Sequence, residues 1–422
     1  MNRLDYPRCG ITLHHGVTNS GLNVFVFPRA EFQTKYAFFA TRYGGCDRRF
    51  LLDGQFTDTP AGIAHFLEHK MFDMPGYQAM DKFADFGASP NAFTSNGMTG
   101  YLFSCVDRFD DSLRELLHYV TTPWFTEESV AKEQGIIGQE IRMGEDNPGR
   151  RVQQNLLKAL YAHHPVRESI AGTVESIAQI SAKTLEDCHR MFYRPENMVL
   201  CCAGDLDPAA VMALAEAASA GPAGPAPARD YGGEESLLPA QVRVEDKMSV
   251  SMPLFRLGAK LPWTADGRDW AKLLLLADLS CMLLMGEGSP LYAQLYAEGL
   301  INKSFYAGSF DFPAGGVCCA GGRCAEPMTV LGRIVDAAEA FRLDGAAQDR
   351  FRRLKKTALG NFLMALDSLD DLCHTQADGF LNGWERMAFP DLCEELQAAD
   401  AADFIHEAFR AQRLAISIVS PL

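Results

Sequence analysis

The segment from Gly62 to Phe72 holds residues whose types and spacing could do chemistry. On a helix, His65 and His69 are four residues apart and lie on the same face, where both imidazoles can bind one metal ion. Neutral imidazole nitrogens suit zinc. Glu68 projects close to this face, and a carboxylate beside a metal can take a proton from water. The pattern His-x-x-Glu-His is the inverted form of the HExxH motif of zinc proteases, and it predicts a zinc site with Glu68 as general base.

Buried core histidines are the alternative for His65 and His69. In a chain with 10 histidines, a chance match to this pattern is roughly a one-percent event. Two histidines with a carboxylate between them are also difficult to bury on a mostly apolar helix without a cation. The residue types therefore favour a metal site.

A catalytic zinc usually has three protein ligands and a water, so His65 and His69 leave one position for the protein to fill. The candidate is Glu140, in a helix expected over residues 127–146. Glu133 lies seven residues earlier, about two turns, and shares a face with Glu140. One carboxylate could bind the metal while the other orients a ligand or water. Paired glutamates on a helix are also typical of a solvated face, so these two residues alone leave the third ligand open.

The elements that must position these residues follow from apolar periodicity. Helices are expected over residues 60–72, 110–121, 127–146, 151–162, 184–192, 267–285, 289–298, 328–342, 347–365 and 399–409. Strands are expected over residues 36–41, 101–106, 197–202, 252–257, 317–320 and 413–418. The apolar runs of the two halves match in order at a shift of about 216 residues, which indicates an internal duplication.

The stretch from Ala218 to Glu235 is dense in Ala, Gly and Pro and predicts a linker. It separates an N-terminal zinc-binding domain, residues 1–217, from a C-terminal domain, residues 236–422. The mixture of helices and hairpin-connected strands predicts an α+β fold of two similar domains, each a mostly antiparallel or mixed sheet covered by helices.

Composition excludes several classes of function. The 422 residues carry 39 Lys and Arg against 54 Asp and Glu, a net charge of −15, which argues against a nucleic-acid partner or an anionic membrane. The most apolar run, Leu273 to Met285, carries Asp278 and is shorter than the roughly 20 residues of a membrane-spanning helix. The first residues lack the apolar stretch of a secretory signal. Twelve cysteines without a CxxC pair favour reduced, buried thiols, and we expect a cytoplasmic protein.

Several further segments agree with one family in the same order along the chain. The chain resembles the pitrilysin/insulinase family of inverted zinc metallopeptidases, which includes the mitochondrial processing peptidase, and within it the bacterial YmfH-type subgroup. The resemblance lies in His65 to Phe72, Gly87 to Ser95, Glu133 to Glu140, Asp146-Asn147-Pro148, His164-Pro165-Val166 and Ala171 to Ile177. It covers the first half almost continuously and the second half mainly in layout.

The resemblance implies a role for each matching residue. His65, His69 and Glu140 would bind zinc, Glu68 would be the general base, and Glu133 would support them. The segment Asn91-Ala92-Phe93 matches the edge strand that binds the substrate backbone by strand addition. Without the family, the same segment would be interpreted as an ordinary sheet edge. His164-Pro165 is interpreted as structural, as a pair that ends a helix.

The resemblance also implies partners. Members of the family close two subunits or halves over unfolded peptides, so this chain is expected to bind a peptide substrate and to form a homodimer or a heterodimer with a related subunit. The second half has no HxxEH and is expected to be an inactive repeat. The second domain of family members usually offers an Arg and a Tyr that hold the substrate. In this chain the corresponding positions fall near Tyr296 and Asn302, so the Arg and the Tyr are missing. Tyr292, Tyr296 and Tyr306 are possible substitutes.

Two functions follow. The sequence predicts a zinc-dependent metalloendopeptidase that hydrolyses peptides or small unfolded proteins in an enclosed chamber. The alternative is a catalytically weak peptide-binding or scaffold subunit of a heterodimeric peptidase. The missing Arg and Tyr favour it, whereas the intact HxxEH and Glu140 argue against it.

Overall fold

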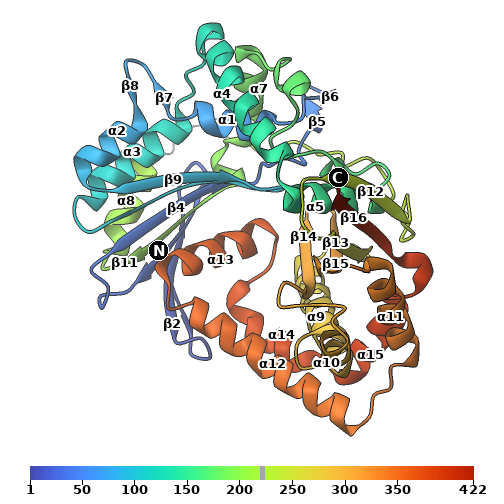
Figure 1. Ribbon diagram of the computed structural model, residues 1–422. Coiled ribbons are helices and arrows are strands. Elements are labelled where there is room, and N and C mark those ends of the chain that lie inside the picture. Colours follow the sequence, from blue (N-terminus) through green and yellow to red (C-terminus); the bar gives the residue numbers. More distant parts are fainter. Residues whose placement is uncertain (219–223) are drawn as a thin grey trace. The chain divides into compact units, whose positions relative to one another are not determined.

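The computed structural model describes residues 1–218 and 224–422 (Figure 1). The chain forms two compact units, each with one large sheet and several helices, so the predicted α+β class is confirmed. The first unit consists of Met1–Ile141, Ser169–Asp230 and Phe362–Pro390. The second unit consists of Arg142–Glu168, Tyr231–Asn361 and Asp391–Leu422.

The units are not continuous in sequence. Arg142–Glu168 belongs to the second unit, and Phe362–Pro390 belongs to the first. The sequence predicts two domains that follow one another along the chain, residues 1–217 and 236–422, and these ranges stay a prediction. Along the predicted linker, the change from one unit to the other falls between Asp230 and Tyr231. Residues 219–223 of that linker lie outside the described residues.

Ala218, the first residue of the predicted linker, ends α8, whereas residues 224–235 form no helix and are held by charged side chains. Arg229 Nε lies 2.9 Å from Oδ1 of the buried Asp47, within the first unit. Within the second unit, the Glu235 carboxylate accepts hydrogen bonds from the backbone N–H groups of residues 162–164 and lies 3.1 Å from Lys260 Nζ. The Gly- and Pro-rich composition is therefore accompanied, over the described residues 224–235, by irregular structure that is anchored at Arg229 and Glu235.

The sheet of the first unit has seven strands in the order β1-β2-β3-β11-β4-β10-β9. Its strands are β1 (Asn2–Tyr6), β2 (Ile11–Val17), β3 (Asn23–Pro28), β4 (Lys35–Thr41), β9 (Ser89–Thr94), β10 (Thr99–Cys105) and β11 (Met198–Gly204). β11 pairs with β3 in parallel, and the other neighbours are antiparallel. Every residue of β11 is buried, as its continuous apolar run requires. Two small hairpins pair β5 (Arg49–Leu52) with β6 (Gln55–Asp58) and β7 (Asp73–Met74) with β8 (Tyr77–Gln78).

The sheet of the second unit repeats part of this topology. Its strands are β12 (Arg243–Met248), β13 (Leu254–Lys260), β14 (Tyr306–Phe312), β15 (Gly315–Arg323) and β16 (Ala415–Pro421). The order β12-β16-β13-β15-β14 corresponds to β3-β11-β4-β10-β9, and the one parallel pair, β12 with β16, falls at the corresponding place. The matched apolar runs of the two halves are thus equivalent strands. The strand expected over residues 252–257 begins two residues later, after Pro253.

The helices agree closely with the periodicity of the sequence. They are α1 (Ile63–Lys70), α2 (Ala79–Phe86), α3 (Phe109–Thr121), α4 (Glu127–Glu145), α5 (Pro148–Leu160), α6 (Val174–Ile177), α7 (Ala182–Phe192), α8 (Pro208–Ala218), α9 (Gly267–Met285), α10 (Pro290–Ala297), α11 (Pro327–Ala340), α12 (Gly345–Ala365), α13 (Leu369–Leu381), α14 (Phe389–Glu395) and α15 (Ala398–Ala408). Short 3₁₀ turns are η1 (Pro165–Arg167), η2 (Pro195–Asn197), η3 (Arg386–Ala388) and η4 (Ala411–Arg413). α2, α6, α8, α13 and α14 were not expected from the sequence.

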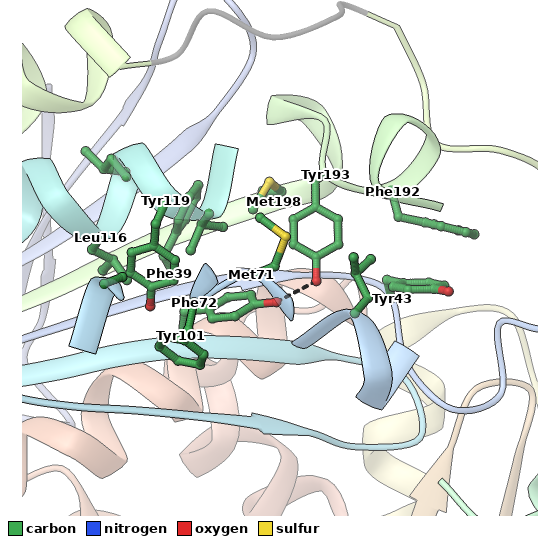
Figure 2. Packing of buried hydrophobic residues seen from close by; sticks show 14 of the residues in the cluster. Phe39, Tyr43, Met71, Phe72, Tyr101, Leu116, Tyr119, Phe192, Tyr193 and Met198 are labelled. Carbon is green, nitrogen blue, oxygen red and sulfur yellow. Dashed lines mark hydrogen bonds between the residues drawn. The ribbon is translucent and has the colours of Figure 1, made fainter. Parts of the chain in front are cut away.

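Apolar side chains cover both faces of the first sheet. On the face that carries α1, α3 and α7, aromatic rings from the strands pack against those of the helices (Figure 2). The hydroxyl oxygens of Tyr101, on β10, and Tyr193 lie 2.7 Å apart there. On the other face, α13 packs on β4 and β11, with Leu372 and Cys373 in the buried cluster. The sheet is thereby fixed on both sides, and its edge strand β9 lies beside α1.

All twelve cysteines are free thiols, and all but the half-buried Cys9 are buried. Among the described residues, none of the helices combines the length and the apolarity needed to cross a membrane.

Candidate metal centre

Helix α1 carries His65 and His69 one turn apart. Gly62 precedes the helix with φ at 94°, and a Cβ there would come within 2.5 Å of the Ala171 carbonyl oxygen, so this position requires glycine. The helix was expected over residues 60–72 and is shorter, because the left-handed conformation of Gly62 fixes its start. Ile63, Phe66 and Leu67 are buried in the core. The two imidazoles occupy the remaining face, with ring centroids 4.6 Å apart.

Glu140, on α4, brings a carboxylate to both imidazoles. Its Oε2 lies 3.6 Å from His65 Nε2 and 3.8 Å from His69 Nε2. Two ligands about 2.1 Å from a tetrahedral zinc ion are about 3.4 Å apart, so these separations fit one ion bound by all three atoms. The ligand atoms of the three residues all lie within 4.8 Å of one another. Two imidazole nitrogens and one carboxylate oxygen are a ligand set for zinc, and the predicted cofactor fits.

Glu133 lies behind His69 on the same helix as Glu140. Its Oε1 is 3.0 Å from His69 Nδ1, and its side chain is largely buried. In the neutral imidazole, a hydrogen bond to this carboxylate places the proton on Nδ1 and leaves the Nε2 lone pair for a metal. Glu133 therefore selects the tautomer of His69 that a metal requires.

Carboxylates surround His69. Burial lowers the pKa of this imidazole, but the hydrogen bond to Glu133 and the charges of Glu68, Glu133 and Glu140 outweigh burial, so the pKa of His69 is raised. A bound cation would neutralise this accumulation of negative charge.

Glu68 is buried beside the two histidines. Its Oε2 accepts a hydrogen bond from Thr94 Oγ1 over 2.7 Å, which leaves Oε1 available to another group. Burial raises the pKa of Glu68, and the hydrogen bond from Thr94 opposes that rise. Glu68 thus lies beside His65, His69 and Glu140, the residues that could hold a metal ion, and is not one of that group. Its role as general base stays a prediction.

The predicted substrate-binding residues lie on β9, the last strand of its sheet among the described residues. Asn91 is exposed, and its Oδ1 accepts a hydrogen bond from the backbone N–H of Ala92 over 2.9 Å. Phe93 lies on the face opposite to that of Ala92 and stacks on Phe38, with ring centroids 5.9 Å apart. The segment is an edge strand, as predicted, and its role toward substrate stays a prediction.

Thr94 is the site residue to which the sequence assigned no role. It shares a strand face with Ala92, so the period of two in β9 could have placed its side chain toward α1. Its partner Glu68 is 26 residues earlier, and no local pattern gives that contact.

The tyrosines expected to replace the missing Arg and Tyr lie in the second unit. Tyr292 and Tyr296 stack on α10, with ring centroids 5.9 Å apart. Tyr306, on the edge strand β14, lies under the guanidinium of Arg256, which is 4.9 Å from its ring centroid. Asn302 donates a hydrogen bond to the Arg323 carbonyl oxygen.

His164 is structural, as predicted, although His164-Pro165 begins the turn η1 and α5 ends earlier, at Leu160. Its Nδ1 accepts a hydrogen bond from the Val166 N–H over 3.1 Å. Its Nε2 lies 2.7 Å from the Pro313 carbonyl oxygen and donates to it. The buried imidazole is therefore neutral, and burial lowers its pKa to about 4.

An α+β fold with two histidines and a glutamate converging beside a buried carboxylate and a sheet edge defines a site of the metallopeptidase class. The family model described as insulinase, peptidase family M16, matches residues 53–174, which include His65, Glu68, His69, Glu133 and Glu140. The model described as the peptidase M16 inactive domain matches residues 179–357.

The chain is 36% identical to the uncharacterized zinc protease YmfH of Bacillus subtilis (strain 168), over 99% of each chain. It is also similar to the crystal structure of an M16-like peptidase from Alicyclobacillus acidocaldarius, with a TM-score of 0.93 and 34% identity over 99% of this chain and 100% of that chain. A protease from Helicobacter pylori shares the fold at 17% identity, with a TM-score of 0.82 over 97% of this chain and 100% of that chain. The chain belongs to the insulinase family, peptidase family M16. The predicted resemblance and the YmfH-type subgroup are thereby confirmed.

Proposed function

We propose that this chain is a zinc-dependent endopeptidase that hydrolyses peptide bonds of peptides or small unfolded proteins. The observation that carries the proposal is the convergence of His65, His69 and Glu140 on one point, with Glu68 next to them and outside the ligand set. Three protein ligands leave the open position that catalytic zinc sites keep, whereas structural sites fill all four.

Each residue has a distinct task in this proposal. A zinc ion held by His65, His69 and Glu140 would lower the pKa of water and polarise a peptide carbonyl. Glu68 accepts a proton from the attacking water at Oε1, because Oε2 is held by Thr94. Glu133 keeps the His69 proton on Nδ1.

The substrate is proposed to bind as an added strand on β9. An edge strand offers unpaired main-chain groups, which bind an extended peptide of almost any sequence. Asn91, Ala92 and Phe93 would contact that peptide. This mode suits unfolded substrates, since an extended segment of an unfolded chain has main-chain groups that are not already paired.

We further propose that the chain acts as a homodimer or as a heterodimer with a related subunit, and that the subunits enclose the peptide in a chamber. This extension rests on the family resemblance. Light scattering would give the mass in solution, and an active monomer would exclude the enclosed chamber. The twelve free cysteines favour a reducing compartment, and we propose the cytoplasm.

A peptide-binding or scaffold subunit is the second candidate. It is favoured by the missing Arg and Tyr of the second unit and by the match of residues 179–357 to an inactive domain. Zinc analysis beside a screen with quenched peptides separates the two functions. The endopeptidase binds about one zinc per chain and cleaves with chelator sensitivity, whereas the scaffold binds peptides without turnover.

A further inference from the structure

Thr94 is the last residue of β9, the strand on which the substrate is proposed to bind. Its hydroxyl donates to Glu68 Oε2 over 2.7 Å, so its side chain contacts the proposed general base. The direction of its main-chain groups then decides whether the same residue also contacts the substrate.

The hairpin that joins β9 to β10 gives this direction. In an antiparallel pair, residues alternate between pairs that exchange hydrogen bonds with each other and pairs that direct them outward. The Ser95 N–H donates to the Met98 carbonyl oxygen over 2.8 Å, which makes Ser95 and Met98 a hydrogen-bonded pair. The next pair, Thr94 and Thr99, is therefore of the outward kind.

The next strand of the sheet gives the same result independently. The Arg42 N–H donates to the Asn197 carbonyl oxygen. At this end of β4, the backbone N–H and C=O groups of even-numbered residues therefore face β11, and those of odd-numbered residues face β10. Thr41 thus exchanges its hydrogen bonds with Thr99, its partner on β10. Because Thr99 directs its N–H and C=O toward β4, those of Thr94 face the open edge.

Pro90 agrees with this assignment. It lies four residues before Thr94, so its backbone groups point to the same side of the strand as those of Thr94. A proline, which has no N–H, is tolerated where that side is an open edge. The backbone groups of Ala92 also point to this side, and its N–H donates to the Asn91 side chain. An added peptide strand would therefore find its main-chain partners at Thr94 and at Ala92, where a peptide carbonyl would displace the Asn91 side chain from the N–H, with only the carbonyl of Pro90 beyond them.

We infer that Thr94 is a positioning residue that couples substrate docking to the general base. Its main chain registers the peptide along the edge, and its hydroxyl fixes the Glu68 carboxylate with Oε1 free. One residue, Thr94, thus positions both the scissile bond of the peptide and the carboxylate that accepts the proton. The inference rests on the proposed function.

The test uses the zinc-loaded full chain with Thr94→Val, which keeps the side-chain shape and strand preference but removes the donor. Thr94→Ser restores the donor, and Ser89→Ala removes a hydroxyl elsewhere on β9 as a control. For a quenched peptide, we expect Thr94→Val to lower kcat by about 10- to 100-fold, as for other groups that orient site residues, with KM and zinc content within about twofold of wild type. Thr94→Ser should recover most of kcat, and Ser89→Ala should change neither constant.

A second measurement does not depend on activity. The free energies of unfolding of Thr94→Val, Glu68→Gln and the double variant should be non-additive, because the two side chains form one hydrogen bond. Wild-type kcat in Thr94→Val, or additive free energies, would overturn the inference while leaving the endopeptidase in place. A wild-type chain that binds zinc but cleaves nothing would instead refute the proposed function, and the unfolding measurements would still test the contact.

Discussion

His69 Nδ1 lies 3.0 Å from Glu133 Oε1, and this contact divides two glutamates of one helix into two roles. Glu140 Oε2 is directed at both Nε2 atoms, 3.6 and 3.8 Å away, whereas Glu133 reaches the far side of one imidazole. We therefore propose that Glu140 is a metal ligand and that Glu133 orients one. The two roles predict different losses of zinc affinity when each carboxylate is neutralised.

Glu140→Gln removes a charged ligand, and we expect zinc affinity to fall by more than 100-fold. Glu133→Gln keeps a hydrogen-bond acceptor for His69, so the loss should be about tenfold. Competition with a chelator of known affinity measures both, with the exposed Glu128→Gln on the same helix as a control. Normal zinc affinity in Glu140→Gln would mean that the third ligand is misassigned and that Glu133 is the next candidate.

The alternation of β9 predicts a period of two in the substrate. N-methylation of a peptide nitrogen removes a donor, and each main-chain hydrogen bond contributes about 1 kcal/mol, so methylation at a residue that pairs with Ala92 or Thr94 should raise KM about fivefold. Methylation at the residues between them should have a much smaller effect. A series of singly methylated peptides tests this, and equal effects at all positions would contradict binding by strand addition.

The charge of −15 leads to a prediction about substrate charge. If much of the acidic excess faces the bound peptide, basic peptides should be cleaved faster than matched acidic ones at low salt, and the difference should shrink at high salt. Rates for such a pair at two salt concentrations measure the effect. Equal rates at low salt would show that the charge lies elsewhere.

His164 predicts a pH dependence of stability. Its pKa is lowered by burial to about 4, below the 6.5 of an unfolded histidine. Between these values the unfolded chain binds a proton that the folded chain does not, so the free energy of unfolding falls as pH decreases from 6.5 to 4, by about 3 kcal/mol in full.

His164→Asn tests this prediction, because the Asn carbonyl can still accept from the Val166 N–H but does not titrate. Urea unfolding of both proteins with chelator, between pH 4 and 7, gives the difference between them. The variant should have a flatter pH dependence, and parallel curves would show that His164 does not contribute.

The local part of the site could be predicted from the sequence. His65 and His69 lie on one helix face because their spacing requires it, and the apolar positions of α1 identify the face that is buried. Glu140 follows from the family resemblance, since paired glutamates on a helix do not by themselves identify a ligand.

Non-local features could not be predicted in this way. The contact of Thr94 with Glu68 joins a strand to a helix, and it depends on the register of β9 along α1. α13 packs on β4 and β11, which are far from it in sequence, and hydrophobic periodicity reports only that a face is buried, not the partner it is buried against. For the same reason, periodicity could not show that Arg142–Glu168 belongs to the second unit and Phe362–Pro390 to the first.

We propose that Glu68 acts as general base beside a zinc held by His65, His69 and Glu140. The most direct measurement is kcat of zinc-loaded Glu68→Gln on a quenched peptide, with zinc content measured on the same samples and Glu128→Gln as control. We expect about one zinc per chain and a loss in kcat on the order of 10²- to 10⁴-fold, because glutamine keeps the acceptor for Thr94 but cannot take a proton. Full cleavage by zinc-loaded Glu68→Gln would contradict it.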